Sequence, residues 1–246
     1  MSELPFGASE IVAGVAGAKR LLDAGCGSGR LTIALAEAGA AVTGVDTNTG
    51  QLQAAARRAS EAGVSLTLRE ADFDDALPFA ESSFDAVVSR LSVMAAADPV
   101  ATLRELGRVL EPGGRIVTAL WAAPAENPWF AAPREAIGVV LGAERARFAR
   151  AFGKLGDPAE AATAHREAGF VEVEAVLLRG TRFAPDAAAY WTELSAENGH
   201  FRRIEAALSD DERAALVAEL DERFVPFHET DRLSLPRTMV LVSARR

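Results

Sequence analysis

Two acids, Asp23 and Asp46, enclose the part of this chain with the clearest binding chemistry. Directly after the first acid, glycines alternate with other residues at Gly25, Gly27 and Gly29. Glycine has no side chain, so three of them in alternation let the backbone approach a ligand closely. A carboxylate at the end of a strand can accept hydrogen bonds from ribose hydroxyls, and we expect Asp46 to take this role. The stretch therefore predicts a site for the adenosine half of a cofactor.

The spacing of the glycines distinguishes one cofactor from another. A dinucleotide fingerprint requires Gly-x-Gly-x-x-Gly, which seats a pyrophosphate at a helix N-terminus, whereas here Arg30 stands at the last of these positions. The carboxylate of Asp23 would repel a pyrophosphate but attracts a ligand with an ammonium and a sulfonium. S-adenosylmethionine (SAM) is such a ligand, and it is the cofactor that this segment predicts.

Short apolar runs on both sides of the glycines predict the elements that position the two acids. Leu21 and Leu22 are typical of the end of a buried strand, and residues 31–35 give a helical apolar face that stops near Gly39. Residues 41–45 form a second apolar run before Asp46. This order of strand, glycine loop, helix, strand and acid is typical of a parallel sheet that binds a cofactor at the carboxyl ends of its strands.

The composition is that of a soluble α/β protein with one large core. The chain has 246 residues, 49% hydrophobic and 25% charged. No apolar run reaches the roughly 18 residues of a membrane span, and the first residues lack the pattern of a secretory signal. The single cysteine, Cys26, excludes an internal disulfide and fits a reducing compartment. We therefore expect a cytoplasmic monomer or homodimer without a membrane partner.

The charge of the chain disfavours a nucleic-acid partner. The net charge is −9, whereas binding to phosphates usually requires a basic face. The arginines at positions 145, 147 and 150 do not share one helical stripe, so we interpret them as a solvated helix face. The partner that we expect is a small-molecule acceptor rather than DNA or RNA.

Further along the chain, two strand ends offer side chains to the same site. Residues 65–72 alternate like a half-exposed strand and end at Asp72, whose carboxylate can accept from an adenine amine beside Phe73. Residues 84–90 predict a buried central strand that ends at Ser89 and Arg90. For this arginine two roles stay open: binding a carboxylate or bracing the loop. For residues 7–18 a lid and a helix packed on the sheet edge are equally compatible with the sequence.

Four separate motifs within residues 20–121 resemble the class I SAM-dependent methyltransferases. They are Leu-Asp-Ala-Gly-Cys-Gly-Ser-Gly, Gly-Val-Asp, Phe-Asp-Ala-Val and Arg-Val-Leu-Glu-Pro-Gly-Gly-Arg-Ile-Val, the last close to the ubiquinone/menaquinone-methylase-like branch. The resemblance implies one domain over residues 1–246 with a Rossmann-like, doubly wound, seven-stranded sheet. This sheet is mostly parallel, with one antiparallel C-terminal strand, and a helical cap accompanies it.

The resemblance also implies which residues contact SAM, whose product is S-adenosylhomocysteine. Position 51 often faces the adenine in this family, and here it is Gln51, just after a helix cap at Thr47 or Asn48. The expected cofactor-binding residues are Asp23, Gly25, Cys26, Gly27, Gly29, Asp46, Thr47, Gln51, Asp72, Phe73, Ser89 and Arg90.

Beyond residue 121 the family pattern loosens, and we expect two helical segments, 122–168 and 185–222, to cap the acceptor. Aromatic side chains can line a hydrophobic slot for a flat acceptor, and the candidates are Trp121, Trp129, Phe130, Tyr190 and Trp191. Met94 is a further candidate, because it lies just beyond the strand at residues 84–90, where the methyl group would face its acceptor. The alternative for each aromatic residue is that it fills the core. Ser209 and Glu212 predict a capping box that begins a helix in the second segment.

The predicted reaction is methyl transfer to O, N or C of a small apolar or aromatic molecule, in which alignment supplies most of the rate. An oxygen or carbon acceptor still needs a base, for which the candidates are His165, His200 and His228. We expect His200 to be the base because aromatic residues surround it in the sequence, although a structural role is the alternative for each histidine. No cluster of His, Cys and carboxylates has metal-ligand spacing, so we expect no metal.

Missing motifs narrow the acceptor and leave two other functions open. No Asn/Asp-Pro-Pro-aromatic run follows the strand at residues 84–90, which disfavours nucleobase amines as acceptors. The only cysteine lies in the glycine loop, which disfavours covalent attack on cytosine. A nicotinamide-dependent oxidoreductase would be compatible with Asp46 alone, but the glycine spacing and Asp23 disfavour it. The other alternative is a domain that binds SAM without transferring its methyl group.

Overall fold

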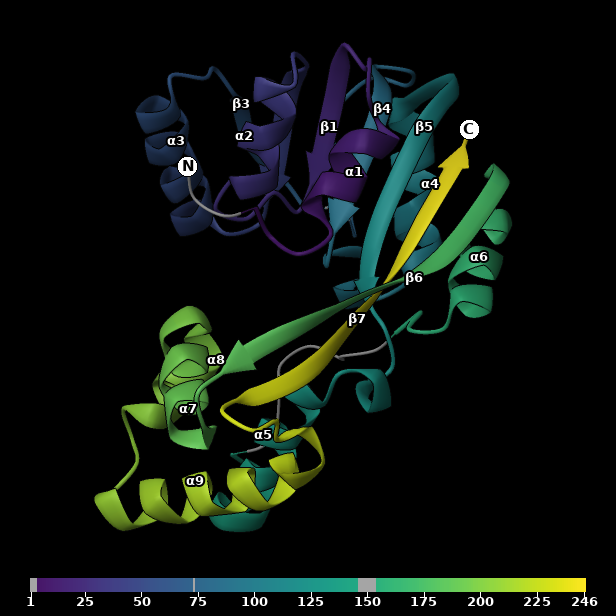
Figure 1. The fold of residues 1–246 in the computed structure, drawn as a ribbon. Helices are drawn as coiled ribbons and strands as arrows, with labels where there is room; N and C mark the ends of the chain where they lie inside the picture. Colours follow the sequence, from purple (N-terminus) through teal and green to yellow (C-terminus); the bar gives the residue numbers. More distant parts are fainter. Residues whose placement is uncertain (1–3, 73, 146–153) are drawn as a thin grey trace. The chain divides into compact units, whose positions relative to one another are not determined.

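The computed structural model describes residues 4–72, 74–145 and 154–246 (Figure 1). Its strands are β1 Arg20–Ala24, β2 Ala41–Asp46, β3 Thr67–Glu70, β4 Phe84–Arg90, β5 Leu110–Trp121, β6 Val171–Ala184 and β7 Leu233–Arg245. Its α-helices are α1 Ala8–Gly14, α2 Arg30–Glu37, α3 Thr49–Ala62, α4 Pro99–Val109, α5 Pro128–Leu141, α6 Pro158–Glu167, α7 Ala187–Glu197, α8 Gly199–Glu205 and α9 Asp210–Phe224. Short 3₁₀ helices are η1 Val93–Ala95, η2 Pro124–Glu126 and η3 Val225–Phe227.

The described strands form one seven-stranded sheet in the order β3-β2-β1-β4-β5-β7-β6. The pairs β2–β3, β1–β2, β1–β4 and β4–β5 are parallel, whereas β7 runs antiparallel to β5. The order reverses on either side of β1, so β1 and β4 form the topological switch point where such sheets bind ligands. The predicted Rossmann-like sheet with an antiparallel C-terminal strand is confirmed.

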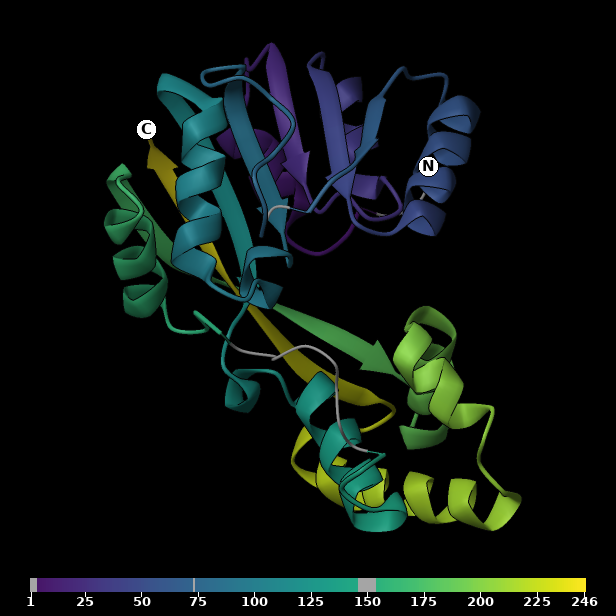
Figure 2. The same ribbon diagram turned by 180° about the vertical axis from the view of Figure 1, so that it is seen from behind.

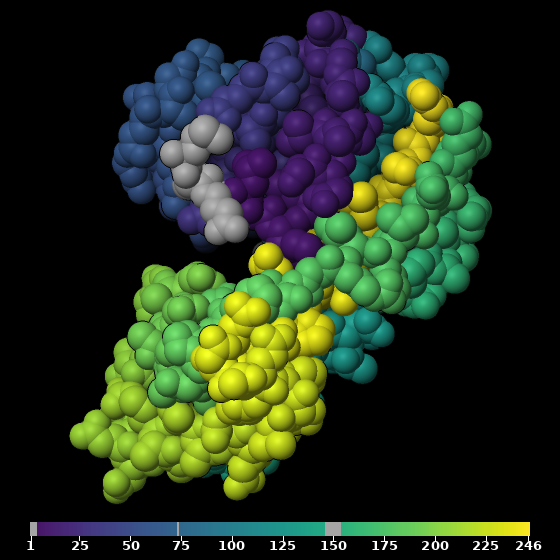
Figure 3. Space-filling model, viewed as in Figure 1, coloured from purple at the N-terminus to yellow at the C-terminus, as the bar shows by residue number. Residues whose placement is uncertain are grey.

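Alternating side chains of the central strands fill a core on each face of the sheet. Leu21 and Ala86 pack with α1 and α2 on one face, and Leu22 and Val87 pack with α4 and α6 on the other. The views from the two sides show these helix layers (Figures 1 and 2), and Figure 3 shows the α1–α2 side in space-filling form. Because these strands are buried on both faces, their sequences are nearly continuous apolar runs.

Short polar side chains begin the helices that follow the strands. Asn48, rather than the alternative Thr47, caps α3, because its Oδ1 accepts a hydrogen bond from the Gln51 backbone N–H. The predicted capping box of Ser209 and Glu212 is confirmed at the start of α9.

Three elements differ from the expected boundaries. The helix expected over residues 7–18 is the shorter α1, and its completely buried Ala8 and Ile11 pack into the sheet core. The fifth strand, which the apolar run predicts over residues 115–121, begins at Leu110, where it already pairs with Phe84. The sixth strand, predicted over residues 172–178, begins at Val171 and continues as far as Ala184. Its neighbour β7 is also long, so the ladder between them extends past the apolar run that marked the strand.

The described residues divide into two compact units. Unit 1 is the described part of residues 1–122, 152–178 and 239–246, and unit 2 is the described part of residues 123–151 and 179–238. Strands β6 and β7 contribute residues to both. Of the two expected capping segments, 185–222 belongs to unit 2, whereas 122–168 is shared because α6 belongs to unit 1. The description as one domain with capping segments stays a prediction.

Unit 2 has an aromatic core of its own. Tyr190 and Trp191 of α7, Phe201 of α8 and Phe224 of α9 are almost completely buried there. The rings of Tyr190 and Phe224 meet edge to face at 5.2 Å between centroids. Asn127, which is completely buried before α5, donates to the Thr238 carbonyl and accepts from the Thr238 N–H.

Among the described residues, none of the helices has both the length and the apolar character that crossing a lipid bilayer would require.

Candidate functional site

The glycine loop lies where β1 ends, and the neighbouring strand fixes its backbone. The N–H groups of Gly25 and Cys26 both donate to the Val45 carbonyl of β2, at 2.8 and 2.9 Å. Gly25, Gly27 and Gly29 all have positive φ, at 78°, 52° and 83°. Because a Cβ atom disfavours this region, the loop can follow this path only with glycine at these positions.

The glycines differ in what lies beside them. At Gly27 an added Cβ would meet no atom within 4 Å, so the backbone there is open to a ligand. At Gly29 it would lie 2.8 Å from the Cβ of Ala55, because α2 and α3 are in close contact at this point. The glycine at position 29 therefore serves helix packing, a function that the motif alone did not indicate.

Asp46 connects the end of β2 to the glycine loop. Its Oδ2 accepts from the Gly27 N–H at 2.9 Å, and its Oδ1 accepts from the Asn48 N–H at 2.9 Å. A carboxylate has about four acceptor sites, so each oxygen can accept a further hydrogen bond. Asp46 is thus held in place by backbone donors and can still bind a pair of hydroxyls.

Asp23 is a buried acid at the floor of the site, with only 1% of its surface exposed. Its Oδ2 accepts a hydrogen bond of 2.7 Å from the Thr32 hydroxyl. Burial raises the pKa of Asp23 from 3.8 to about 6, against opposing effects of the Thr32 hydrogen bond and of the Arg90 charge. A cation placed beside this carboxylate would lower its pKa again.

A cavity of about 200 Å³ opens beside the loop in unit 1. Its lining residues are Pro5, Asp23, Gly25, Cys26, Gly27, Ser28, Arg30, Leu31 and Arg90. An acid and two arginines thus line the same cavity. The Nε of Arg90 donates to the Phe6 carbonyl at 3.0 Å. Both roles of this arginine, bracing the loop and binding a carboxylate, stay predictions.

The thiol of Cys26 packs against β2 and is not set up as a nucleophile. An added Cβ at Gly44 would lie 2.9 Å from its Sγ, so the thiol fills the space left by that glycine. Burial, together with the charges of Asp23 and Asp46, raises the pKa of the thiol to about 12. Its contribution is to shape the wall of the cavity.

The chain turns sharply where β4 ends. Ser89 is buried and donates from its hydroxyl to the Ala24 carbonyl at 2.9 Å, joining β4 to β1. Leu91 adopts a φ of 65°, an unusual conformation for a branched side chain. Met94 is 4% exposed, and its sulfur accepts from the Trp121 N–H at 3.4 Å. Trp121 is half-buried and stacks on Phe6.

Three of the remaining expected cofactor contacts lie on the surface of unit 1. Thr47, Gln51 and Asp72 are exposed. The Oδ1 of Asp72 accepts from the Asp74 N–H at 3.0 Å, within the acidic turn after β3. Phe73 lies outside the described residues. The roles of these four residues in cofactor binding stay predictions.

In unit 2 the expected acceptor contacts are mostly core residues. Tyr190 and Trp191 are completely or almost completely buried, as the core-filling alternative describes. The Tyr190 hydroxyl donates to the Trp129 carbonyl, and the Trp191 Nε1 donates to Glu205 at 2.6 Å. The indole of Trp129 donates to Asn127 at 3.0 Å. An acceptor-binding role for these rings stays a prediction.

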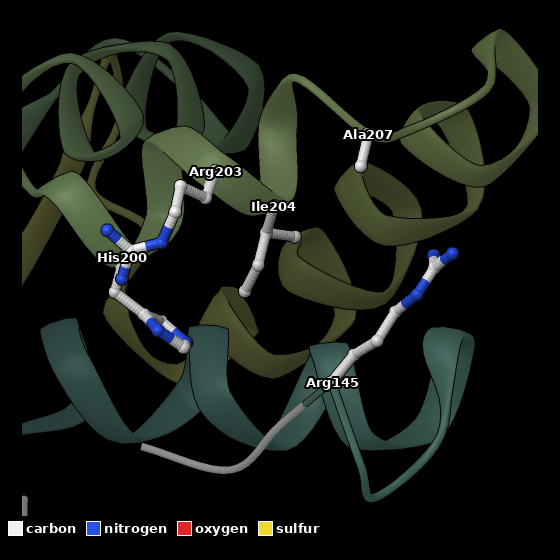
Figure 4. Close-up of a pocket in the computed structure, with 5 residues that line it drawn as sticks. All are labelled: Arg145, His200, Arg203, Ile204 and Ala207. Carbon is white, nitrogen blue, oxygen red and sulfur yellow. The ribbon is translucent and has the colours of Figure 1, made fainter. Parts of the chain in front are cut away.

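The three histidines have different surroundings. His165 is completely buried, with Nε2 3.0 Å from the Thr118 hydroxyl and Nδ1 2.7 Å from the Ala161 carbonyl, and burial lowers its pKa. His228 is exposed near Asp221. His200 lies on α8 and lines a pocket of unit 2 (Figure 4). Its pKa is lowered by burial and by the Arg203 charge, and its role as a base stays a prediction.

Two residues that the sequence analysis did not single out hold Asp23 and the glycine loop in place. Thr32 holds Asp23, and the Nη1 of Arg58 in α3 donates to the Ser28 carbonyl of the loop at 2.8 Å. A threonine within the apolar face of α2 was a detectable signal for the first, because a buried hydroxyl needs a partner. The second is a contact between residues thirty positions apart, and no local pattern indicates it.

The family described as a methyltransferase domain matches residues 22–118. Residues 22–118 are similar to this methyltransferase domain. The resemblance to class I SAM-dependent methyltransferases that the motifs predicted is thereby confirmed, and SAM is the cofactor that this family uses. The methyltransferase domain contains the loop, Asp46, Asp72, Ser89 and Arg90.

Curated relatives share this domain. An uncharacterized protein of Mycobacterium tuberculosis is 40% identical over 109 residues, which are 44% of this chain and 39% of the relative. A demethylmenaquinone methyltransferase of Clavibacter sepedonicus is 42% identical over 114 residues, 46% of this chain and 45% of the relative. The chain therefore spans less than half the length of these relatives.

A solved structure resembles the chain over almost its whole length. A putative methyltransferase from Bacillus halodurans matches with a TM-score of 0.64 at 21% identity, covering 97% of each chain. At this identity the likeness shows the fold alone. The methyltransferase domain and the strands beyond it thus belong to a known architecture.

Proposed function

We propose that this chain is a SAM-dependent methyltransferase that acts on O, N or C of a small apolar or aromatic molecule. One observation carries the proposal: Asp23 and Asp46 flank a loop whose backbone is open at Gly27. Two carboxylates next to bare backbone favour a cationic nucleoside over a pyrophosphate. The family match of residues 22–118 supports the same conclusion.

The described residues fit the separate parts of SAM. The buried carboxylate of Asp23 suits the ammonium of the methionine part, and its raised pKa reflects the lack of a nearby cation strong enough to offset burial. Arg90 lines the same cavity and suits the methionine carboxylate. The remaining acceptor sites of Asp46 suit the ribose hydroxyls.

Bound SAM supplies an electrophilic methyl group. The acceptor forms a bond to this methyl as the bond to sulfur breaks, which leaves S-adenosylhomocysteine. The protein's task is to hold the acceptor in line with the methyl, and an alignment at about 3–3.5 Å can contribute several kcal/mol. An O–H or C–H acceptor also loses a proton, and His200 is our candidate for the base that removes it.

The proposed partner is a small molecule, without a nucleic acid or a membrane. The net charge of −9 supports this proposal, since phosphate backbones and anionic lipids attract basic proteins. We further propose that the chain acts in the cytoplasm as a monomer or homodimer. The single cysteine, buried at position 26, supports a reducing compartment.

Two measurements test the proposal in sequence. Calorimetry with S-adenosylhomocysteine and with NAD compares the two cofactor classes, and we expect binding of the former only. Heat with NAD alone would refute the assignment. Transfer of labelled methyl from SAM to a panel of phenols, amines and quinols then tests the reaction. Binding without transfer to any member of a broad panel would favour the alternative of a domain that binds SAM without methylating.

A further inference from the structure

A small pocket in unit 2 is lined by basic and apolar side chains. Its volume is about 220 Å³, and its lining residues are Arg145, His200, Arg203, Ile204 and Ala207. We call it the arginine–histidine pocket. In the view of Figure 4, Ile204 lies between the pair of His200 and Arg203 on one side and Arg145 on the other.

The charge of this pocket contrasts with that of the chain. None of the five described residues that line it is acidic, although the whole chain has a net charge of −9. Among the described residues Arg203 has no hydrogen-bonded partner, and it is close enough to His200 to lower the pKa of that imidazole. A guanidinium without an acidic partner, such as that of Arg203, is stabilised when an anion binds to it.

Arg145 can take part in such binding while it keeps its own partner. Its Nη1 donates to Glu212 at 3.2 Å, and Glu212 also accepts from the Ser209 N–H in the capping box of α9. A guanidinium has five N–H donors, so one contact leaves donors for a ligand. The contact with Glu212 fixes the position of the arginine at the pocket.

Two apolar side chains, Ile204 and Ala207, also line the pocket. Ile204 packs on the aromatic core of unit 2. The cavity is about seven times the volume per water molecule in the liquid, which is room for a head group and a short apolar chain. Burial of the ligand's apolar chain against Ile204 would add a hydrophobic contribution to the charge interaction.

We propose that the arginine–histidine pocket binds the carboxylate or phosphate head group of a small amphiphilic molecule. The apolar part of this molecule lies against Ile204 and Ala207. The proposal goes beyond methyl transfer and does not depend on it, because the described lining residues all belong to unit 2 and binding is measured without a cofactor.

Calorimetry on the full chain tests this with octanoate, octyl phosphate, inorganic phosphate and 1-octanol as probes. We expect at least one of the two amphiphilic anions to bind about tenfold more tightly than 1-octanol and inorganic phosphate, since the first lacks the charge and the second the chain. The comparison of octanoate with octyl phosphate identifies the head group. Equal affinity for 1-octanol, or no binding of either amphiphilic anion, would overturn the proposal.

Arg203→Gln and Arg202→Gln provide a matched pair, since both remove one positive charge from α8 but only Arg203 lines the pocket. We expect about tenfold weaker anion binding for the first and less than a twofold change for the second. Equal losses would refute the site. If Arg203→Gln loses its circular dichroism signal, two other variants replace it. Arg203→Lys should retain anion binding, and Arg145→Gln should weaken it.

A nuclear magnetic resonance experiment locates the ligand. The ring signal of His200, assigned from the His200→Gln spectrum, should shift on addition of the anion, whereas the signals of His165 and His228 should not. Binding that leaves the His200 signal in place would mean that the ligand occupies another site, and the proposal would be wrong.

Discussion

The Thr32 hydroxyl donates a 2.7 Å hydrogen bond to Asp23, and this is the one side-chain hydrogen bond that the described residues offer to this buried carboxylate. One hydroxyl does not replace the hydration that the carboxylate loses on burial, so its pKa rises to about 6. The protein without cofactor therefore contains a destabilising charge, and a ligand ammonium can use it for binding.

Asp23→Asn should stabilise the protein without cofactor and weaken cofactor binding. A rise of the pKa from 3.8 to about 6 corresponds to about 3 kcal/mol of lost stability near neutral pH. The amide has no charge to desolvate and can still accept from Thr32, so we expect the free energy of unfolding in urea to increase by up to this amount. Calorimetry with S-adenosylhomocysteine should show binding at least about tenfold weaker. If Asp23→Asn had a lower free energy of unfolding and an unchanged affinity for S-adenosylhomocysteine, both parts of this prediction would be wrong.

The same carboxylate predicts the pH dependence of cofactor binding. Asp23 is ionised above about pH 6 and protonated below it, and only the ionised form attracts an ammonium. We expect the affinity for S-adenosylhomocysteine to be constant above about pH 6 and to fall by up to tenfold per pH unit below it. The Asp23→Asn variant is the control and should lack this fall. A wild-type affinity independent of pH down to about 5 would exclude Asp23 from the site.

Asp46→Ala should weaken cofactor binding by about 1–3 kcal/mol, because it leaves the ribose hydroxyls without their acceptor. The change also removes the acceptors of the Gly27 and Asn48 N–H groups, so a modest loss of stability should accompany it. Asp46→Asn keeps one acceptor oxygen and should lie between the wild type and the alanine variant. Calorimetry and thermal unfolding measure the two effects, and unchanged affinity in Asp46→Ala would remove this residue from the site.

Gly29→Ala and Gly27→Ala should separate packing from ligand access. At position 29 an alanine has an unfavourable positive φ and its Cβ lies 2.8 Å from Ala55 Cβ, whereas at position 27 no atom lies within 4 Å. Positive φ costs about 1–2 kcal/mol in each variant, and overpacking adds about 1–3 kcal/mol to the first. Gly29→Ala should therefore unfold at lower urea concentration, while Gly27→Ala should mainly lose cofactor affinity.

A second substitution tests whether contact with Ala55 causes the larger loss of stability in Gly29→Ala. Ala55→Gly removes the methyl group that the new side chain meets at 2.8 Å but keeps the Cα that it meets at 3.1 Å. The double variant with Gly29→Ala should therefore recover part of the packing loss but not the cost of the positive φ. An additive double variant would show that the two side chains do not interact.

Local patterns were sufficient to predict the central sheet and the position of the loop. The runs at β1, β2 and β4 are buried on both faces, so their apolar residues mark them without ambiguity. Asp46 was predictable because an acid directly after such a run must lie at the carboxyl edge of the sheet. The far end of β6 was not predictable, because its residues pair with β7, which lies far along the chain.

Unit 2 was less predictable because its aromatic residues occur singly in helices. A ring that lines a slot and a ring that fills a core have the same helical spacing, so Tyr190 and Trp191 could not be assigned to either role from the sequence. Asn127 shows the same limit. Its hydrogen bonds with Thr238 join residues more than a hundred positions apart, and they depend on the course of β7.

The pair of His165 and Thr118 predicts a loss of stability in mild acid. His165 is completely buried, and its pKa is lowered by burial, whereas in the unfolded chain it binds a proton near its ordinary value of 6.5. Below about pH 6.5 the unfolded chain therefore holds more protons than the folded one at this residue, and the free energy of unfolding should fall as the pH decreases. Asp23 acts in the opposite direction between about pH 4 and 6, because its pKa is raised, so each effect is measured as a difference from the wild type.

His165→Gln should remove this acid-dependent part of the stability. The exposed His228 provides the control, because His228→Gln removes a histidine whose ring is not buried. Urea unfolding at several pH values between about 5 and 8 should give a smaller acid-side decrease for His165→Gln than for the wild type, and the same decrease for His228→Gln. Thr118→Val keeps the shape but removes the hydroxyl beside Nε2, and should lower the free energy of unfolding by about 1–3 kcal/mol at neutral pH. Equal pH profiles for both histidine variants would mean that the buried ring accepts a proton without cost, contrary to its surroundings.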